Sequence, residues 1–122
     1  MEFHPHQAIY LQIVDYICEK ILRQEWVDQD RIPAVREIAM SIEVNPNTVM
    51  RAYVYLEEKH IIYTKRGIGY FVSKEAYQKT LKLKKAAFLK HQAPAFFKQI
   101  KLLGIRFDEL KALFLQQGEN EK

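Results

Sequence analysis

The fold of this chain is decided by residues 32–72, which read IPAVREIAMSIEVNPNTVMRAYVYLEEKHIIYTKRGIGYFV. Residues 32–39 open a helix, because Pro33 suits a position just before or inside the first turn, and an arginine lies in that turn. Residues 44–49 open a second helix soon afterwards, and residues 61–72 read as two strands joined by a basic turn that contains glycine. A helix, a short turn, a second helix and a basic hairpin are typical of a winged helix, which places its second helix in the DNA major groove.

The second helix of this segment carries the residues that we expect to read DNA. Asn45 is a strong helix cap and Pro46 suits the first helical position. Asn47, Thr48 and Arg51 lie outside the apolar face and offer groups that bind base edges or phosphate. That apolar face repeats at helical spacing, at Val49, Ala52, Tyr53 and Leu56. Simple capping of a surface helix is the competing interpretation. We favour capping for Asn45 and DNA contact for the other three.

The expected hairpin and the first turn of the preceding helix complete the candidate DNA-binding set. Lys65, Arg66 and Gly67 form the hairpin tip, where an arginine reaches a phosphate or enters a minor groove. Glycine at the tip permits positive φ. Arg36 lies in the first turn of the preceding helix, on the side away from its apolar residues. A basic hairpin alone is weak support for DNA binding, but one that directly follows such a helix is strong support.

Composition and charge limit the other functional classes. The 122 residues are 48% hydrophobic and 28% charged, with no apolar run of membrane-spanning length, so we expect a globular protein without membrane insertion. The first 74 residues hold nine Lys or Arg against ten Asp or Glu, a net charge of −1, while the remainder carries the other +5 of the total of +4. A DNA-binding head of this charge must therefore concentrate its cations on one face.

The single cysteine and the histidines predict neither disulfides nor a metal site. Cys18 flanks a helical stripe that begins at Tyr10, and its expected role is core packing in a reducing cytoplasm. His4 and His6 are spaced like zinc ligands but lack further ligands to complete a site. We expect no metal and no cofactor. Because no nucleophile–base pair or phosphate loop is present, we also expect no enzyme.

These motifs, in this order, resemble the head domain of the GntR family of bacterial transcription regulators. The resemblance begins at residues 9–13 (IYLQI), continues through residues 31–37 (RIPAVRE) and residues 44–49 (VNPNTV), and ends with residues 64–72 (TKRGIGYFV). It implies a winged helix that binds a pseudopalindromic operator as a homodimer. The family's DNA contacts correspond to the following positions: Arg36, Asn45, Asn47, Thr48, Arg66 and Gly67.

Several positions depart from the family pattern. Some relatives carry a basic residue where this chain has Met50, so that base contact is either lost or made by Arg51. Relatives often have glycine at Glu43 and His60, and Pro-Gly within residues 28–30, which read DQD here. A non-glycine residue at positive φ costs on the order of 1 kcal/mol, which leaves open whether these turns keep the family's geometry.

The residues after the hairpin predict a short helical tail. We divide the chain into a DNA-binding domain at residues 1–73 and a dimerisation or effector region at residues 74–122. Helices are expected from Lys74 to about Gln92, with a break or kink at Pro94, then to Leu103, and again over residues 107–117. This segment is too short to bury its own apolar side chains, so we expect a second copy to cover them. The side chains assigned to that interface are Tyr77, Leu81, Phe88, Phe96, Phe97, Ile100, Leu110, Leu113 and Phe114.

The short tail is similar to that of the YtrA-type branch of the family, and this resemblance implies control of a transporter operon. The sequence therefore predicts a cytoplasmic homodimeric repressor of a double-stranded DNA operator. The alternative is a winged-helix protein-interaction module or a sequence-independent architectural DNA binder. The sequence leaves open whether a small-molecule effector binds, and it identifies none. A basic stretch after the hairpin reads as a solvated helix face, or as support for DNA phosphates or an acidic partner, and comprises Lys79, Lys82, Lys84, Lys85 and Lys90.

Overall fold

The computed structural model describes residues 1–120, and residues 121 and 122 of the expected tail lie outside the described residues. The elements follow in the order α1 (Ile9–Leu22), α2 (Val35–Ser41), α3 (Pro46–Glu58), β1 (Ile62–Lys65), β2 (Gly69–Val72), α4 (Ala76–Ala87), a π-helical turn (Phe88–Gln92), α5 (Ala93–Leu102) and α6 (Phe107–Asn120). This helical chain with one antiparallel hairpin confirms the expected fold class. It forms two compact units, Met1–Leu83 and a second that begins at Lys84.

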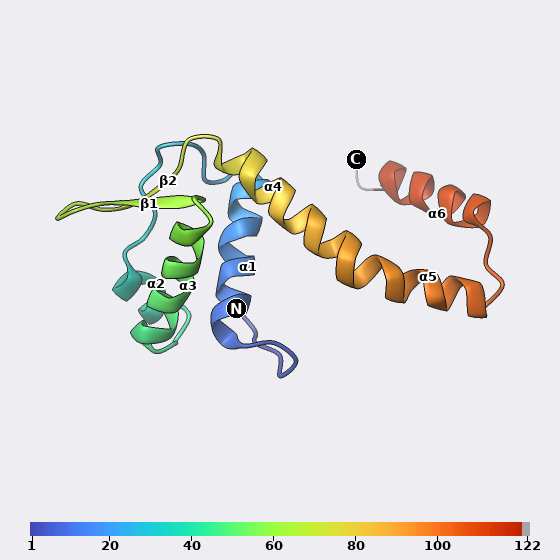
Figure 1. Cartoon of the computed structure of the whole chain (residues 1–122), viewed down its shortest axis with the longest axis horizontal. Helices are drawn as coiled ribbons and strands as arrows, with labels where there is room; N and C mark the ends of the chain where they lie inside the picture. Colours follow the sequence, from blue (N-terminus) through green and yellow to red (C-terminus); the bar gives the residue numbers. More distant parts are fainter. Residues whose placement is uncertain (121–122) are drawn as a thin grey trace. The chain divides into compact units, whose positions relative to one another are not determined.

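The core of the first unit lies between α1, α3 and the hairpin (Figure 1). The predicted stripe of α1 is buried in it, including Ile13, Ile17 and Ile21, and Cys18 is buried beside them. Each such aliphatic side chain contributes roughly 1.5–3 kcal/mol when it leaves water. Gln12 is also buried, and its amide bonds the backbone of the N-terminal arm at the His4 nitrogen and oxygen, 3.0 and 2.8 Å away. The arm is thereby attached to α1.

Local signals in the sequence start α2 and α3 where they were expected. The Glu37 carboxylate accepts the backbone N–H of Ala34 at 3.3 Å, which satisfies a free donor at the start of α2. The Asn45 side chain accepts the backbone N–H of Asn47 at 2.8 Å, and Pro46 occupies the first turn of α3. The Tyr53 hydroxyl of α3 donates to the Pro33 carbonyl and ties α3 to the start of α2.

The hairpin gains a short third strand from the segment before α2. β1 and β2 pair antiparallel with Ile62 opposite Val72 and Lys65 opposite Gly69. Arg31 forms an isolated bridge with Phe71 on the other edge of β2. Two backbone bonds flank it, from the Ile32 N–H to the Tyr70 carbonyl and from the Val72 N–H to the Asp30 carbonyl, at 3.0 and 2.9 Å. The base of the hairpin is therefore fixed to the start of α2.

The second unit contains a helical irregularity at the expected place. Proline has no N–H and its ring collides with the carbonyl four residues earlier, so an α-helix cannot pass Pro94 unchanged. The helix widens into the π-helical turn Phe88–Gln92 just before that residue, which accommodates it. α5 then ends near Gly104, which adopts φ 65°. The last helix, expected over residues 107–117, extends to Asn120.

The start of α4 differs from the sequence expectation by two residues. The predicted start at Lys74 is wrong, because Glu75 adopts φ 63° and interrupts the helical backbone before Ala76. The Asp28 carboxylate accepts the Glu75 N–H at 2.8 Å. A residue far away in the sequence therefore determines where this helix begins. None of the helices within residues 1–120 is long and apolar enough to cross a membrane.

Candidate nucleic-acid interface

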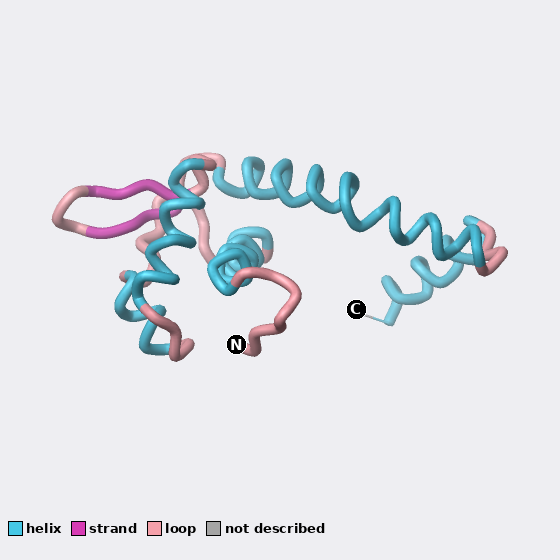
Figure 2. The backbone as a smooth tube through the Cα atoms, turned by 60° about the horizontal axis from the view of Figure 1, so that its bottom comes forward, coloured by secondary structure: helices cyan, strands magenta, loops and turns pink. Residues whose placement is uncertain are grey.

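The candidate interface is formed by α2, the start of α3 and the hairpin. In both backbone views the hairpin projects on the side of the first unit that carries α2, and α1 lies on the other side (Figures 1 and 2). Arg36 is exposed in the first turn of α2. It follows Pro33, whose carbonyl is held by Tyr53, so the backbone that presents this arginine is braced by α3.

The start of α3 presents two side-chain amides, that of Asn45, which caps the helix, and that of Asn47, which is exposed. The Asn45 side-chain oxygen is occupied by the cap, as its capping interpretation predicted. Asn47 is exposed in the first turn, and Thr48 is half-buried beside it. These positions follow from the 100° rotation per residue, since Val49 and Ala52 face the core and are fully buried. The exposed edge of this turn combines hydrogen-bonding side chains with a helix N-terminus, which favours anions.

Arg51 and Met50 occupy opposite flanks of α3. The Arg51 guanidinium lies over the Tyr10 ring of α1, with its carbon 3.9 Å from the ring centroid. Met50 is 41% exposed on the other flank, and its sulfur accepts the Tyr70 hydroxyl of the hairpin at 3.6 Å. Arg51 is therefore drawn toward α1, and Met50 is the residue beside the hairpin. Periodicity alone, which grouped Arg51 with Asn47, does not reveal this stacking contact.

The hairpin tip is basic and exposed, and glycine provides its backbone geometry. Lys65, Arg66 and Gly67 are all exposed, and Gly67 adopts φ 78°. The Lys65 ammonium lies 4.8 Å from the centroid of the Phe71 ring, which also stacks on Tyr63. The lysine is thus held along the outer face of the hairpin, and Arg66 extends beyond it at the tip. Thr64 turns to the other face, where it donates to the Glu57 carboxylate at 2.7 Å.

Three turn residues adopt backbone angles that glycine tolerates best. Gln29, Glu43 and His60 have φ values of 72°, 56° and 60°. Glu43 and His60 are two positions at which relatives were expected to carry glycine, and Gln29 lies in the segment where Pro-Gly was expected. The backbone at all three is therefore left-handed even though each residue carries a side chain. The turn at His60 also receives support from α4, because the Lys79 ammonium donates to the His60 carbonyl at 3.2 Å.

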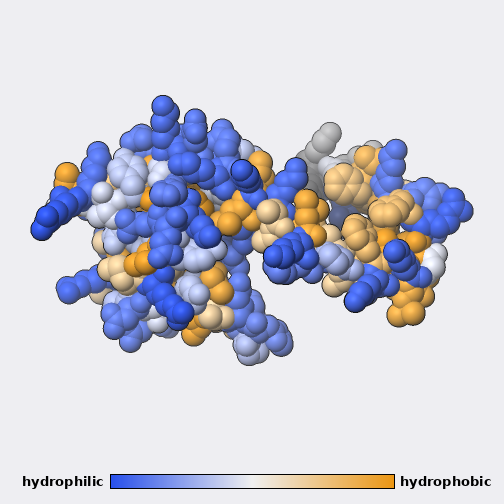
Figure 3. Space-filling model, in the orientation of Figure 1, coloured by the Kyte–Doolittle hydropathy of each residue, from blue (hydrophilic) through white to orange (hydrophobic). Residues whose placement is uncertain are grey.

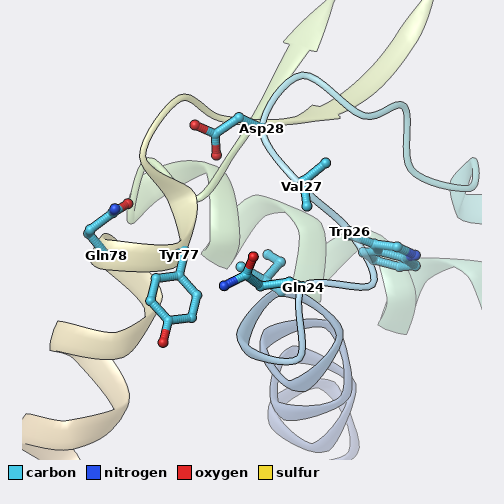
Figure 4. A pocket seen from close by; sticks show the side chains of 7 residues that line it. Gln24, Trp26, Val27, Asp28, Tyr77 and Gln78 are labelled. Carbon is cyan, nitrogen blue, oxygen red and sulfur yellow. The ribbon is translucent and has the colours of Figure 1, made fainter.

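A cavity of about 310 Å³ lies in the first unit beside the start of α4. Figure 4 shows Tyr77 and Gln78 of α4 facing Gln24, Val27 and Asp28 from the segment after α1. The lining combines aromatic rings, side-chain amides and a single carboxylate. Within the part of the chain that the structure describes, no three His, Cys, Asp or Glu side chains are grouped to hold a metal ion.

The tail residues assigned to the dimer interface fall into two classes. Tyr77 lines the cavity of the first unit, Ile100 is buried and Leu110 is half-buried. The others are exposed, and apolar side chains gather over the second unit in the space-filling view (Figure 3). This exposed class consists of Leu81, Phe88, Phe96, Phe97, Leu113 and Phe114.

A second apolar hollow lies in the second unit, between the end of α5 and the start of α6. It has a volume of about 560 Å³ and is lined mainly by Phe97, Ile100, Ile105 and Phe107. Phe97 and Phe107 meet edge to face there, with ring centroids 6.0 Å apart. The aliphatic parts of Lys101 and Arg106 complete its rim. The tail therefore presents both projecting rings and a hollow of matching character.

Comparisons with known proteins agree with this architecture. Residues 9–72 match the sequence profile described as bacterial regulatory proteins of the gntR family. The chain is 36% identical to the HTH-type transcriptional regulator YhcF of Bacillus subtilis, over 89% of this chain and 88% of that protein. It is also 36% identical to the HTH-type transcriptional repressor YtrA of the same organism, over 84% of this chain and 78% of that protein.

A solved structure extends the similarity to the tail. The GntR-family transcriptional regulator from Listeria monocytogenes superimposes with a TM-score of 0.75 at 33% identity. The match covers 93% of this chain and 98% of that one. The similarity therefore includes α4, α5 and α6 as well as the winged helix.

Proposed function

Because this chain belongs to the GntR family of bacterial transcription regulators, we propose that it is a cytoplasmic repressor that binds a pseudopalindromic operator as a homodimer. The protein is a transcription regulator with a DNA-binding helix-turn-helix, and not an enzyme. One observation carries the proposed mode of binding. The exposed polar start of α3, the first turn of α2 and the basic hairpin tip project from one side of the first unit.

In the proposed complex, each element of this side has its own task. Arg36 binds a backbone phosphate at the start of α2, and the exposed turn at Asn47 and Thr48 contacts base edges in the major groove. Arg66 extends from the tip of the hairpin into the adjacent minor groove. Lys65 and Gly67 support that insertion, the lysine through its charge and the glycine by allowing close approach to the sugar–phosphate backbone. Asn45 contributes mainly by capping α3.

Arg51 has a secondary role in this arrangement. Its stacking on Tyr10 holds the guanidinium at the α1 flank of α3, from which it can reach a phosphate at the groove edge. Met50 faces the hairpin and offers an apolar contact, such as a thymine methyl group, where a basic side chain would select guanine.

The proposed dimer forms through the tail. Twofold operators require two heads, and symmetric association places the same surface of each copy in contact. The exposed rings of the second unit support a second copy of this chain as the occupant, because they project beside a hollow of matching apolar character. Lys101 and Arg106 also line this hollow. Their charges argue against a contact with lipid alone, or with a fully apolar surface like a protein core.

Repression and the class of regulated gene rest on the relatives. One relative is named a transcriptional repressor, YtrA, and the match to it covers 84% of this chain and 78% of that protein. We extend repression to this chain on that ground. Control of a transporter operon is proposed from resemblance to the same branch. For an effector, the cavity beside Tyr77 and Gln24 is the place to test, because a ligand there would contact the start of α4.

Selection of random duplex DNA by the full chain, followed by sequencing, tests the proposal directly. A twofold-symmetric motif at near-physiological salt is the expected result, with affinity for it falling steeply as salt rises. Arg36→Ala and Arg66→Ala should each weaken binding to the selected site by roughly tenfold, as loss of one charged contact does. Arg23→Ala removes an exposed arginine that pairs with Glu19 on α1, and serves as the charge-matched control.

The outcomes separate the alternatives. Salt-dependent duplex binding without any enriched motif would favour an architectural DNA binder. Absence of duplex binding by a folded dimer would favour a protein-interaction module. Undiminished operator binding by both arginine variants would refute the proposed contact surface, even if the motif itself were found.

A further inference from the structure

Arg31 lies at the junction of the hairpin and α2, and it is distinct from the proposed DNA contacts Arg36 and Arg66. Its backbone bridges Phe71 and makes it part of the short third strand. The trace between α1 and α2 runs from the base of the hairpin to α2 on the side from which the hairpin projects (Figure 1). Arg31 therefore lies where the chain passes from the base of the hairpin to α2, the two elements that carry the proposed contacts Arg66 and Arg36.

The alternation of a strand turns the Arg31 side chain to the outer face. The next residue, Ile32, is only 2% exposed and points into the core. Arg31 shares the outer face with Phe71, Lys65 and Gly69, because Phe71 bridges it and alternate residues of a strand lie on one side. This face thus carries two cations, Arg31 and Lys65.

Gly69 makes room for the guanidinium. A Cβ atom at this position would lie 3.2 Å from the Arg31 Nε and 3.5 Å from one of its terminal nitrogens. The arginine therefore lies against bare backbone at the root of the hairpin. Gly69 also adopts φ 145°, which side chains rarely tolerate, so two separate constraints favour glycine here.

The N–H donors of the Arg31 guanidinium are available to an external acceptor. Among the described residues it forms no hydrogen bond or ion pair, and the carboxylates nearest in sequence are used elsewhere. Asp30 accepts the Val27 N–H at 2.9 Å, and Asp28 accepts the Glu75 N–H at 2.8 Å. An arginine presents five N–H donors in a planar fork that suits a phosphate. A packed arginine with a neighbouring lysine and no partner anion is a site for an external anion.

We propose that Arg31 binds a DNA backbone phosphate at the root of the hairpin and thereby sets how deeply the hairpin tip enters the groove. The inference rests on the proposed DNA-binding function. A phosphate fits better than a base, because the arginine lies back from the tip and phosphates line the groove edges. The held guanidinium gives the hairpin a fixed anchor at its root, whereas Arg66 is exposed at the tip.

The test measures the affinity of the full chain for its selected operator and for a scrambled duplex across a series of KCl concentrations. Arg31→Gln should weaken binding to both duplexes by a similar factor, roughly tenfold, and lower the slope of log affinity against log salt by about one. Arg31→Lys should restore most of the slope because the charge returns, but less of the affinity because the fork does not. Arg23→Gln, with the same charge change on α1, should leave the slope and the affinity nearly unchanged.

Thermal unfolding of each variant distinguishes binding from support of the fold. We expect the unfolding temperature of Arg31→Gln to lie within about 2 °C of that of the original chain, since a solvent-facing arginine contributes little to stability. An unchanged salt slope in Arg31→Gln would overturn it, as would an affinity loss that merely follows a large loss of stability. If the original chain itself shows no salt-dependent duplex binding, the proposed function fails first, and the Arg31 contact with it.

Discussion

At the scale of single residues, several turns of this protein place a residue other than glycine in the left-handed conformation that glycine adopts most easily. His60 adopts φ 60° just after α3, and the Ile61 N–H closes the turn onto the Leu56 carbonyl at 3.0 Å. A left-handed conformation costs a residue with a Cβ roughly 1–2 kcal/mol. The turn persists because Ile61 must enter the core, where it is fully buried.

His60→Gly should therefore be more stable than His60→Ala. The expected difference is on the order of 1 kcal/mol, because relief of the left-handed strain outweighs the extra chain entropy of glycine in the unfolded state. Chemical denaturation of the two variants measures it. Comparison with alanine removes the contribution of the histidine side chain itself. Equal stability of both variants would contradict the argument.

Tyr53 makes the stability of this protein depend on pH. Burial, followed by the nearby Tyr70 and Glu37, raises the pKa of Tyr53 far above its ordinary value of 10.0. The folded state thus keeps the phenol protonated at a pH where the unfolded chain releases the proton. Its contribution to stability is complete below pH 10 and is lost progressively as the pH rises above that value.

Tyr53→Phe should change both the level and the pH dependence of stability. At pH 7 we expect a loss of about 1 kcal/mol, since the Pro33 carbonyl loses its donor. Above pH 10, the original chain should lose up to about 1.4 kcal/mol more per pH unit than the variant. Unfolding measured from pH 8 to 11 checks this, with Tyr55→Phe on the same helix as control. Parallel curves for the original chain and Tyr53→Phe would refute the buried titration.

At the scale of elements, helix boundaries follow local signals except where a distant residue intervenes. Asn45-Pro46 starts α3 through its own cap, and Pro94 accounts for the π-helical turn from within its own helix. The start of α4 is different, since Asp28 holds the Glu75 N–H from a loop 47 positions earlier in the chain. No local pattern within residues 74–76 contains that information.

Pro94→Ala should convert the π-helical turn into regular α-helix. Alanine restores the N–H that proline lacks and removes the ring clash, so the amide of residue 94 can bond the Lys90 carbonyl. Amide hydrogen exchange and chemical shifts across residues 88–94 measure the change, and helical content should rise slightly. Pro5→Ala is a proline control outside the helices. A π-helical turn that persists in Pro94→Ala would show that another contact causes it.

At the scale of the whole molecule, the second unit leaves too much apolar surface exposed for an isolated chain. Phe114 is 74% exposed and Phe88 is 53% exposed. Burial of each such ring on association offers roughly 1.5–3 kcal/mol before the costs of ordering. A dimer through the tail also supplies the two heads that a twofold operator needs.

Phe114→Glu should therefore dissociate the proposed dimer. A charge placed in a desolvated apolar contact opposes association strongly, so sedimentation should show a shift toward monomer by at least about 100-fold in the dimer dissociation constant. Operator affinity should fall with it through lost avidity. Met40→Glu, a similar change at an 82% exposed residue of α2, should leave sedimentation unchanged. An intact dimer in Phe114→Glu would place the interface elsewhere.

The sequence by itself determined the winged helix, because its signals are local. The 3.6-residue stripes of α1 and α3, the Asn-Pro cap and the two glycines of the hairpin each depend on a few adjacent residues. The exposure of Arg36 and Asn47 followed from the helical period, and that of Arg66 from its place in the glycine-containing turn.

Only the tertiary structure decided which side chains contact one another around this surface. It stacked Arg51 on Tyr10, set Met50 beside Tyr70, and laid Arg31 over Gly69. These pairs join residues separated by 20 or more positions, and their geometry depends on how α1, α3 and the hairpin pack. The helical and strand periods predict the direction in which a side chain points. The residue that this side chain contacts depends on the element packed against it.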